Sequence, residues 1–194
     1  MTSPIYRDPR LYRAVLRTLY GDALAARERI VARLVRPGSV VADVACGDAG
    51  IRRRLRGVRY VGLDVSPTFV RALQRSGVEA IQSDASRGDL PIVADYVLLL
   101  GSLYQFLPDA DRILDRLARS ARTAVVVAEP FRNLAQSANP VVAALARRAT
   151  DPGVDAATAR FDEASLRALF VRHRATEVHA TSRELVASIP GRAR

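Results

Sequence analysis

The stretch that decides the fold of this chain spans residues 40–50 and reads VVADVACGDAG. An apolar run ends on Asp43, a turn of small residues follows, and we expect a helix to begin near Gly50. A second apolar run, residues 60–63, ends on Asp64, which lies 21 residues after Asp43. This layout is typical of a βαβ unit that holds a nucleoside, because small residues let the backbone approach the ligand and the second acid accepts hydrogen bonds from ribose hydroxyls. An ordinary strand–turn–helix with two unrelated acids is the alternative.

Two classes of cofactor-binding protein share this layout. Residues 45–50 fit a dinucleotide fingerprint whose first glycine is alanine, and they fit equally well the Asp-x-Gly-x-Gly-x-Gly motif of class I S-adenosylmethionine-dependent methyltransferases. The chain resembles that methyltransferase family, which carries an acid at the position of Asp43, where dinucleotide folds usually continue an apolar strand. Ala45 and Ala49 stand at two glycine positions of the motif, and alanine lacks the easy access of glycine to positive φ.

The composition excludes several other classes. All 30 basic residues are arginine, so neither a Tyr-x-x-x-Lys dehydrogenase pair nor a lysine-bearing phosphate loop is available. The single cysteine, Cys46, excludes a disulfide framework. No window approaches 18 consecutive apolar residues, and the first residues lack the apolar core of a signal peptide. We therefore expect a cytoplasmic, soluble protein without a membrane segment.

Caps and periodicity predict the other elements. A helix is expected from Pro9, an interruption at Gly21-Asp22, and a second helix to about Val35. After the two strands already named, the pattern predicts helices over 67–76, 109–119, 140–148 and from about 163, and strands over 79–82, 96–100, 124–128, 174–181 and 184–189. The last two strands are close enough to form a hairpin.

The fold class predicted from this order is α/β. Five β–α alternations that end in a hairpin match the Rossmann-like, seven-stranded, mostly parallel sheet of the family, with helices on both faces and an antiparallel last strand. At 194 residues the chain has room for one compact domain. We expect residues 1–36 to form an N-terminal helical cap and residues 37–194 to form the methyltransferase domain.

The resemblance implies a set of cofactor-binding residues for S-adenosylmethionine. Asp43 and the turn Ala45, Cys46 and Gly47 would lie beside the methionine part, and Asp64 and Val65 beside the ribose and adenine. The remaining members are Asp84 and Ala85 at the adenine, and Leu100 and Gly101 where the family presents the methyl group. A helix-capping Asp64 and an ordinary loop at Asp84 are the alternatives.

The sequence signals for catalytic residues are weaker than those for the cofactor. The candidates are Tyr104, Gln105 and Glu129; Glu129 is either the base or an acid held by a cap or an ion pair. Small-molecule members of the family often have a histidine near Gln105, whereas His173 and His179 are expected to be structural or surface residues. No His/Asp/Glu cluster has the spacing of metal ligands, so we expect no metal.

The substrate would be recognised outside the sheet. The candidates are Tyr6, Tyr12 and Tyr20 in an N-terminal lid, which is alternatively a packed structural helix, and Asn133 in the segment after the fifth strand. Such a small cap favours a small or medium-sized metabolite, methylated at oxygen or nitrogen by in-line displacement.

Two other functions remain open. The net charge of +10 and the arginines at 52–54 and 56 leave an RNA methyltransferase as one alternative, although a GC-rich genome also explains arginine in place of lysine. The two alanines leave a non-catalytic cofactor-binding subunit as the other. We expect a small-molecule partner rather than nucleic acid, no membrane, and a monomer or homodimer.

Overall fold

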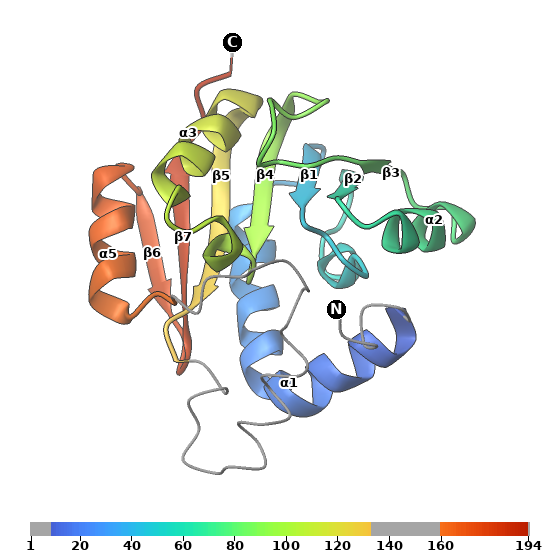
Figure 1. The fold of residues 1–194 in the computed structure, drawn as a ribbon, viewed down its shortest axis with the longest axis horizontal. Helices are drawn as coiled ribbons and strands as arrows, with labels where there is room; N and C mark the ends of the chain where they lie inside the picture. The colour runs from blue at the N-terminus through green and yellow to red at the C-terminus, as the bar shows by residue number, and fades with distance from the viewer. Residues whose placement is uncertain (1–8, 133–159, 194) are drawn as a thin grey trace.

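A computed structural model describes the backbone of residues 9–132 and 160–193 and the side chains from residue 22 onward within those ranges. Its strands form one seven-stranded sheet in the order β3-β2-β1-β4-β5-β7-β6 (Figure 1). In chain order the strands are β1 (Val40–Val44), β2 (Arg59–Asp64), β3 (Ala80–Gln82), β4 (Ala94–Leu100), β5 (Ala121–Pro130), β6 (Glu177–Ala180) and β7 (Glu184–Pro190).

The directions of the strands confirm the predicted fold class. The first five strands are parallel, and β7 runs antiparallel both to β5 and to its hairpin partner β6. β4 lies in the middle of the sheet and is apolar on both faces, as a continuous run of apolar residues predicts for a central parallel strand. The sheet therefore has the mostly parallel, seven-stranded layout expected from the sequence.

Helices cover both faces of this sheet. On one face, α3 (Ala110–Ser120) and α5 (Glu163–Arg172) pack on alternate residues of the strands, such as Val97 and Leu99. The opposite face, which includes Tyr96 and Leu98, packs against α1 (Pro9–Leu34) and α2 (Pro67–Arg75). This alternation follows from the pleat, which points successive side chains to opposite faces.

One prediction about the N-terminal region was wrong. The chain does not form two helices separated at Gly21-Asp22, because α1 runs without interruption from Pro9 to Leu34. A glycine inside a helix costs about 1 kcal/mol relative to alanine, which is less than the gain from burying a residue such as Val31 further along the same helix. Figure 1 shows that α1 changes direction along its length, with its first half below the edge of the sheet toward which β4 points.

The helix expected near Gly50 is also shorter than a full α-helix. It is a single 3-10 turn, η2 (Gly50–Arg53), preceded by Ala49 in the left-handed conformation. The chain enters β2 only a few residues later, at Arg59, so the connection has no room for further turns. The arginines at 52–54 and 56, in this turn and directly after it, are exposed.

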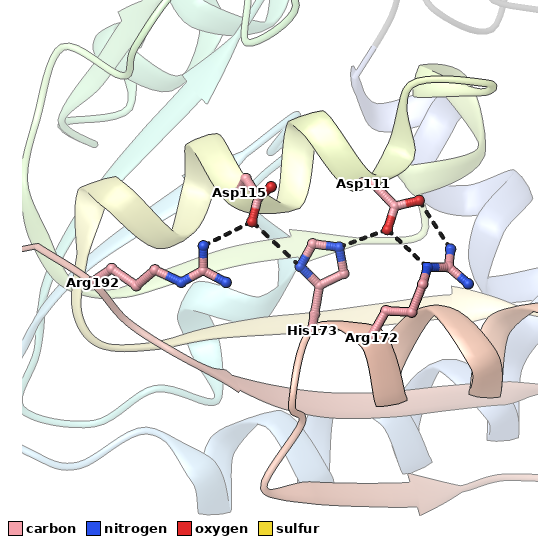
Figure 2. Close-up of polar contacts among 5 residues, drawn as sticks. All are labelled: Asp111, Asp115, Arg172, His173 and Arg192. Atoms are coloured by element: carbon pink, nitrogen blue, oxygen red, sulfur yellow. Dashed lines mark hydrogen bonds and ion pairs between the residues drawn. The ribbon is translucent and has the colours of Figure 1, made fainter.

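On the face of the sheet covered by α3 and α5, a polar cluster joins these two helices to the C-terminal segment (Figure 2). The buried ring of His173, at the end of α5, contacts Asp111 through Nε2 at 2.9 Å and lies 3.7 Å from Asp115 through Nδ1. Arg172 donates to both oxygens of Asp111, and Arg192 donates to Asp115. These contacts give His173 a structural role, as expected, whereas His179 is exposed and contacts Glu177.

The predicted helix over 140–148 lies outside the described residues.

Candidate active site

The predicted cofactor residues meet at one edge of the sheet. β1 lies between β2 and β4, and all three are parallel, so their carboxyl ends are neighbours at this edge. Open α/β sheets bind ligands at the carboxyl ends of their strands, where the order of the strands reverses. Here the chain moves outward from β1 to β2 and then crosses to β4, so the turn after β1 lies at that reversal.

The turn after β1 is held in an unusual backbone conformation. Ala45, Gly47 and Ala49 all have φ close to +50°, which is the left-handed region that favours glycine. Two alanines therefore adopt the conformation for which the family motif uses glycine, at a cost of about 1–2 kcal/mol each. Hydrogen bonds from Cys46 N–H to the Leu63 carbonyl (3.1 Å) and from Ala49 N–H to the Cys46 carbonyl (2.8 Å) maintain it.

Asp64 fastens this turn to β2. One carboxylate oxygen, Oδ2, accepts from the Gly47 N–H at 2.8 Å, and the other, Oδ1, accepts from the Ser66 N–H at 2.8 Å. Burial raises the pKa of this carboxyl, and the two backbone donors act in the opposite direction. Asp64 therefore does not cap α2, whose N-cap is Ser66; it holds the residue before that helix and tethers Gly47, a contact that the sequence did not predict. Each oxygen keeps a second lone pair for a further donor.

Asp43 has a partner that the sequence analysis missed. Its Oδ2 accepts from the Tyr60 hydroxyl at 2.5 Å, and the side chain is only 3% exposed. Burial raises the pKa of Asp43 to about 7, while the Tyr60 hydroxyl and the guanidinium of Arg27 lower it. Position 60 points to the same face of the sheet as position 43, so the pairing follows once the register of β1 against β2 is known.

Cys46 fills the space above Gly62 in β2. A Cβ added at Gly62 would lie 2.8 Å from the Cys46 Sγ, which is too close for any side chain. Burial raises the pKa of the thiol, so it is the protonated form that packs there. This contact gives the small thiol a packing role in the turn and explains a glycine in the middle of a strand.

The residues predicted at the adenine lie in the loops after β2 and β3. Val65 is 62% exposed directly after Asp64, which leaves its apolar side chain uncovered at this edge. Asp84 accepts from both the N–H and the hydroxyl of Ser86 and pairs with Arg87. The Ser86 hydroxyl is the largest cause that lowers the pKa of Asp84. These contacts make the Asp84 segment a well-formed turn.

The end of β4 leads into the predicted catalytic residues. Gly101 has a φ of +72°, and its N–H donates to the Ala128 carbonyl at 2.6 Å. The chain then enters the short turn η3 (Leu103–Phe106), which carries Tyr104 and the exposed Gln105. The guanidinium carbon of Arg160 lies 3.9 Å from the centre of the Tyr104 ring, a cation–π contact that the sequence analysis did not predict.

Glu129 is buried behind this turn. It lies at the end of β5, is 1% exposed, and accepts from the Leu103 N–H at 2.8 Å through Oε2. Burial raises its pKa to about 8, while the N–H groups of Leu103 and Tyr104 lower it. The carboxyl therefore fixes the position of η3, which is the capped arrangement left open by the sequence.

The residues predicted for a lid are only partly described. Tyr12 and Tyr20 belong to α1, but the description of side chains begins at residue 22. Tyr6 and Asn133 lie outside the described residues. Within the described ranges, no group of three or more His, Cys, Asp or Glu residues could hold a metal ion. In the same ranges, no helix has both the length and the apolar character that crossing a membrane requires.

Comparison with known proteins places the chain in a family. The sequence profile described as "Methionine biosynthesis protein MetW" matches residues 26–137, more than half of the chain. The chain belongs to the MetW family. A search of curated proteins found no match.

Solved structures with the same fold include S-adenosylmethionine-dependent methyltransferases. One is a chain of the Haloferax volcanii complex between the Trm112 methyltransferase activator and a proposed methyltransferase, with a TM-score of 0.69, 18% identity, and coverage of 99% of this chain and 100% of that one. Another is an S-adenosylmethionine-dependent methyltransferase from Aquifex aeolicus, with a TM-score of 0.59, 14% identity, and coverage of 94% and 98%.

A third structure was solved with the product of methyl transfer. The N-terminal domain of EvdMO1, in the presence of S-adenosylhomocysteine and D-fucose, has a TM-score of 0.57, 18% identity, and coverage of 88% of this chain and 82% of that one. Together, these similarities confirm that the chain has the fold of class I methyltransferases.

Proposed function

We propose that this MetW-family protein transfers the methyl group of S-adenosylmethionine to oxygen or nitrogen of a small or medium-sized metabolite. The observation that carries the proposal is Asp64, whose two oxygens hold Gly47 and Ser66 and keep lone pairs for ribose hydroxyls. The exposed Val65 beside it offers apolar surface to an adenine ring. The left-handed turn next to Asp64 lets a ligand approach the backbone closely.

Bound S-adenosylmethionine supplies a methyl group that is already activated on a sulfonium. The protein then has mainly to hold the nucleophile in line, and good orientation can contribute about 7–11 kcal/mol. We assign this task to the turn η3, because Glu129 fixes it from behind through the Leu103 N–H. Tyr104 and Gln105 on that turn are the residues we expect to touch the substrate.

Glu129 can also take part in proton transfer. A pKa of about 8 lies close to neutral pH, which suits a group that exchanges a proton with a substrate hydroxyl or amine. Glu129→Gln separates its two roles, because glutamine keeps an acceptor for the Leu103 N–H but cannot take a proton. A variant with normal cofactor binding and a lost pH dependence of kcat would support the base.

A small substrate is supported by the place of α1. Its first half lies below the edge of the sheet toward which β4 points, the position expected of a small cap over the site (Figure 1). The family description names methionine biosynthesis, which favours a metabolite as well.

The test of the proposed function is binding of the cofactor and its product. S-adenosylmethionine and S-adenosylhomocysteine should each raise the melting temperature, with a gain of about 2.7 kcal/mol at 100 times the Kd. NAD serves as the control with the same adenosine but without the methionine part. A shift with NAD and none with the two methionine nucleosides would refute the proposal.

RNA is a second candidate substrate because four exposed arginines, at 52–54 and 56, lie close together in the sequence in and just after η2. RNA binding that weakens steeply with salt, followed by methylation of the RNA, would favour this candidate. The Haloferax volcanii structure, a complex with an activator, gives a reason to test a third case. Cofactor binding by the isolated chain without any methyl transfer would favour a subunit that needs a partner.

A further inference from the structure

One buried cation reaches the same edge of the sheet from α1. Arg27 extends toward the end of β4, where a Cβ added at Gly101 would lie 3.1 Å from its Nη1. The same nitrogen is 3.3 Å from Oε1 of Glu184, at the start of β7. The two side chains are 15% and 4% exposed, so this ion pair is largely removed from water.

The ion pair leaves polar atoms unsatisfied on both partners. Nε of Arg27 and Oε2 of Glu184 are buried and have no hydrogen-bond partner. A buried polar atom without a partner costs about 1–3 kcal/mol, and more when the group is charged. A purely structural ion pair is expected to satisfy these atoms, whereas a ligand site leaves donors and acceptors for the ligand.

The surroundings of Arg27 carry both signs of charge. Burial raises the pKa of Asp43, on β1, and the positive charge of Arg27 lowers it. Arg27 likewise lowers the pKa of Glu184, which burial raises. One cation with a free donor therefore pairs with Glu184 and acts electrostatically on Asp43, a carboxyl from a different strand.

This arrangement is complementary to the end of an α-amino acid, which carries a carboxylate and an ammonium group. We propose that Arg27 binds the carboxylate of the methionine part of the cofactor and that Glu184 positions its guanidinium. The inference rests on the proposed function, and it agrees with the expectation that Asp43 lies beside the methionine part. The fit to Gly101 supports it, because any side chain at that position would crowd the guanidinium.

The test compares two ligands that differ in the amino-acid end. S-adenosylhomocysteine carries the carboxylate, whereas 5′-methylthioadenosine has the same nucleoside and a thioether but lacks the amino-acid end. Calorimetry of Arg27→Met should show about 10- to 150-fold weaker binding of S-adenosylhomocysteine, the range for hydrogen bonds to charged groups. Binding of 5′-methylthioadenosine should stay within about threefold of the wild-type value, a change of less than about 0.7 kcal/mol.

Two further variants show whether a loss of binding comes from misfolding. Arg27→Met with Glu184→Gln removes both charges, so no unpaired carboxylate remains buried, and it should show the same selective loss. Arg29→Met changes an exposed arginine on the same helix and should leave both affinities unchanged. Circular dichroism and the melting temperature show whether each variant is folded.

The outcomes separate this inference from the proposed function. Equal losses for the two ligands in the folded double variant would overturn the inference, because Arg27 would then shape the whole site. Unchanged S-adenosylhomocysteine binding would overturn it as well and place the carboxylate elsewhere. Wild-type protein that binds neither ligand would refute the proposed function, and the inference with it.

Discussion

Asp64→Asn tests the placement of the nucleoside with the smallest change of shape. Asparagine has one acceptor oxygen and an NH₂ group, whereas Asp64 uses both oxygens to accept from Gly47 and Ser66. One of these two backbone donors will therefore face another donor. The loss of a hydrogen bond to a charged group costs about 1.5–3 kcal/mol, which corresponds to a melting temperature lower by about 3–12 °C for a domain of this size.

The loss of cofactor binding should be as large as the loss of stability, and it can be measured separately. A ribose hydroxyl that donates to the missing oxygen loses about 1.5–3 kcal/mol, so Kd for S-adenosylhomocysteine should rise about 10- to 150-fold. Calorimetry below the lower melting temperature measures it without interference from unfolding. Asp48→Asn is the matched control, because asparagine keeps an acceptor for the Gly50 N–H, to which Asp48 Oδ1 bonds at 3.2 Å. Similar rises of Kd in the two variants would refute the assignment of the ribose to Asp64.

Three further predictions concern the buried groups. Gly62→Ala should destabilise the fold through its 2.8 Å approach to the Cys46 Sγ, and adding Cys46→Ala should recover most of the loss in denaturant unfolding. The pKa of Asp43 is raised to about 7, so between about pH 4 and 7 the folded protein holds a proton that the unfolded chain has released. The free energy of unfolding should therefore fall as the pH rises through this range. Asp43→Asn should make this fall smaller. Asp111→Leu leaves His173 without its partner and should cost about 1–3 kcal/mol in the same melts, whereas Asp111→Asn, which can still accept from Nε2, should cost less.

The sheet could be predicted from sequence because its signals are local. Each parallel strand is an apolar run of a few residues, and several end on an acid or a turn that sets the boundary. Ser66-Pro67 and Asp162 mark helix starts, and the structure places α2 and α5 directly after them. Asp64 lies at the carboxyl end of β2, as predicted, because the end of a parallel strand is fixed once the strand is known.

The contacts between distant residues could not be predicted in the same way. The Tyr60–Asp43 hydrogen bond needs the register of β1 against β2, and the Arg27–Glu184 pair joins residues 157 positions apart. Arg27 looked like one of many arginines on a helix, and only the path of α1 across the sheet gives it a place at the site. The break expected at Gly21 failed because a local glycine signal is weaker than the packing of the whole helix.

The features that break local rules gather at one edge of this molecule. Two of its three described non-glycine residues with positive φ, Ala45 and Ala49, lie in the turn after β1. The buried acids Asp43, Glu129 and Glu184 end or begin strands at the same edge, and burial raises the pKa of each. Strained backbone and buried charge both reduce stability, so a sequence that keeps them together at one edge favours function over stability there. We therefore expect the active site at this edge, around the turn after β1.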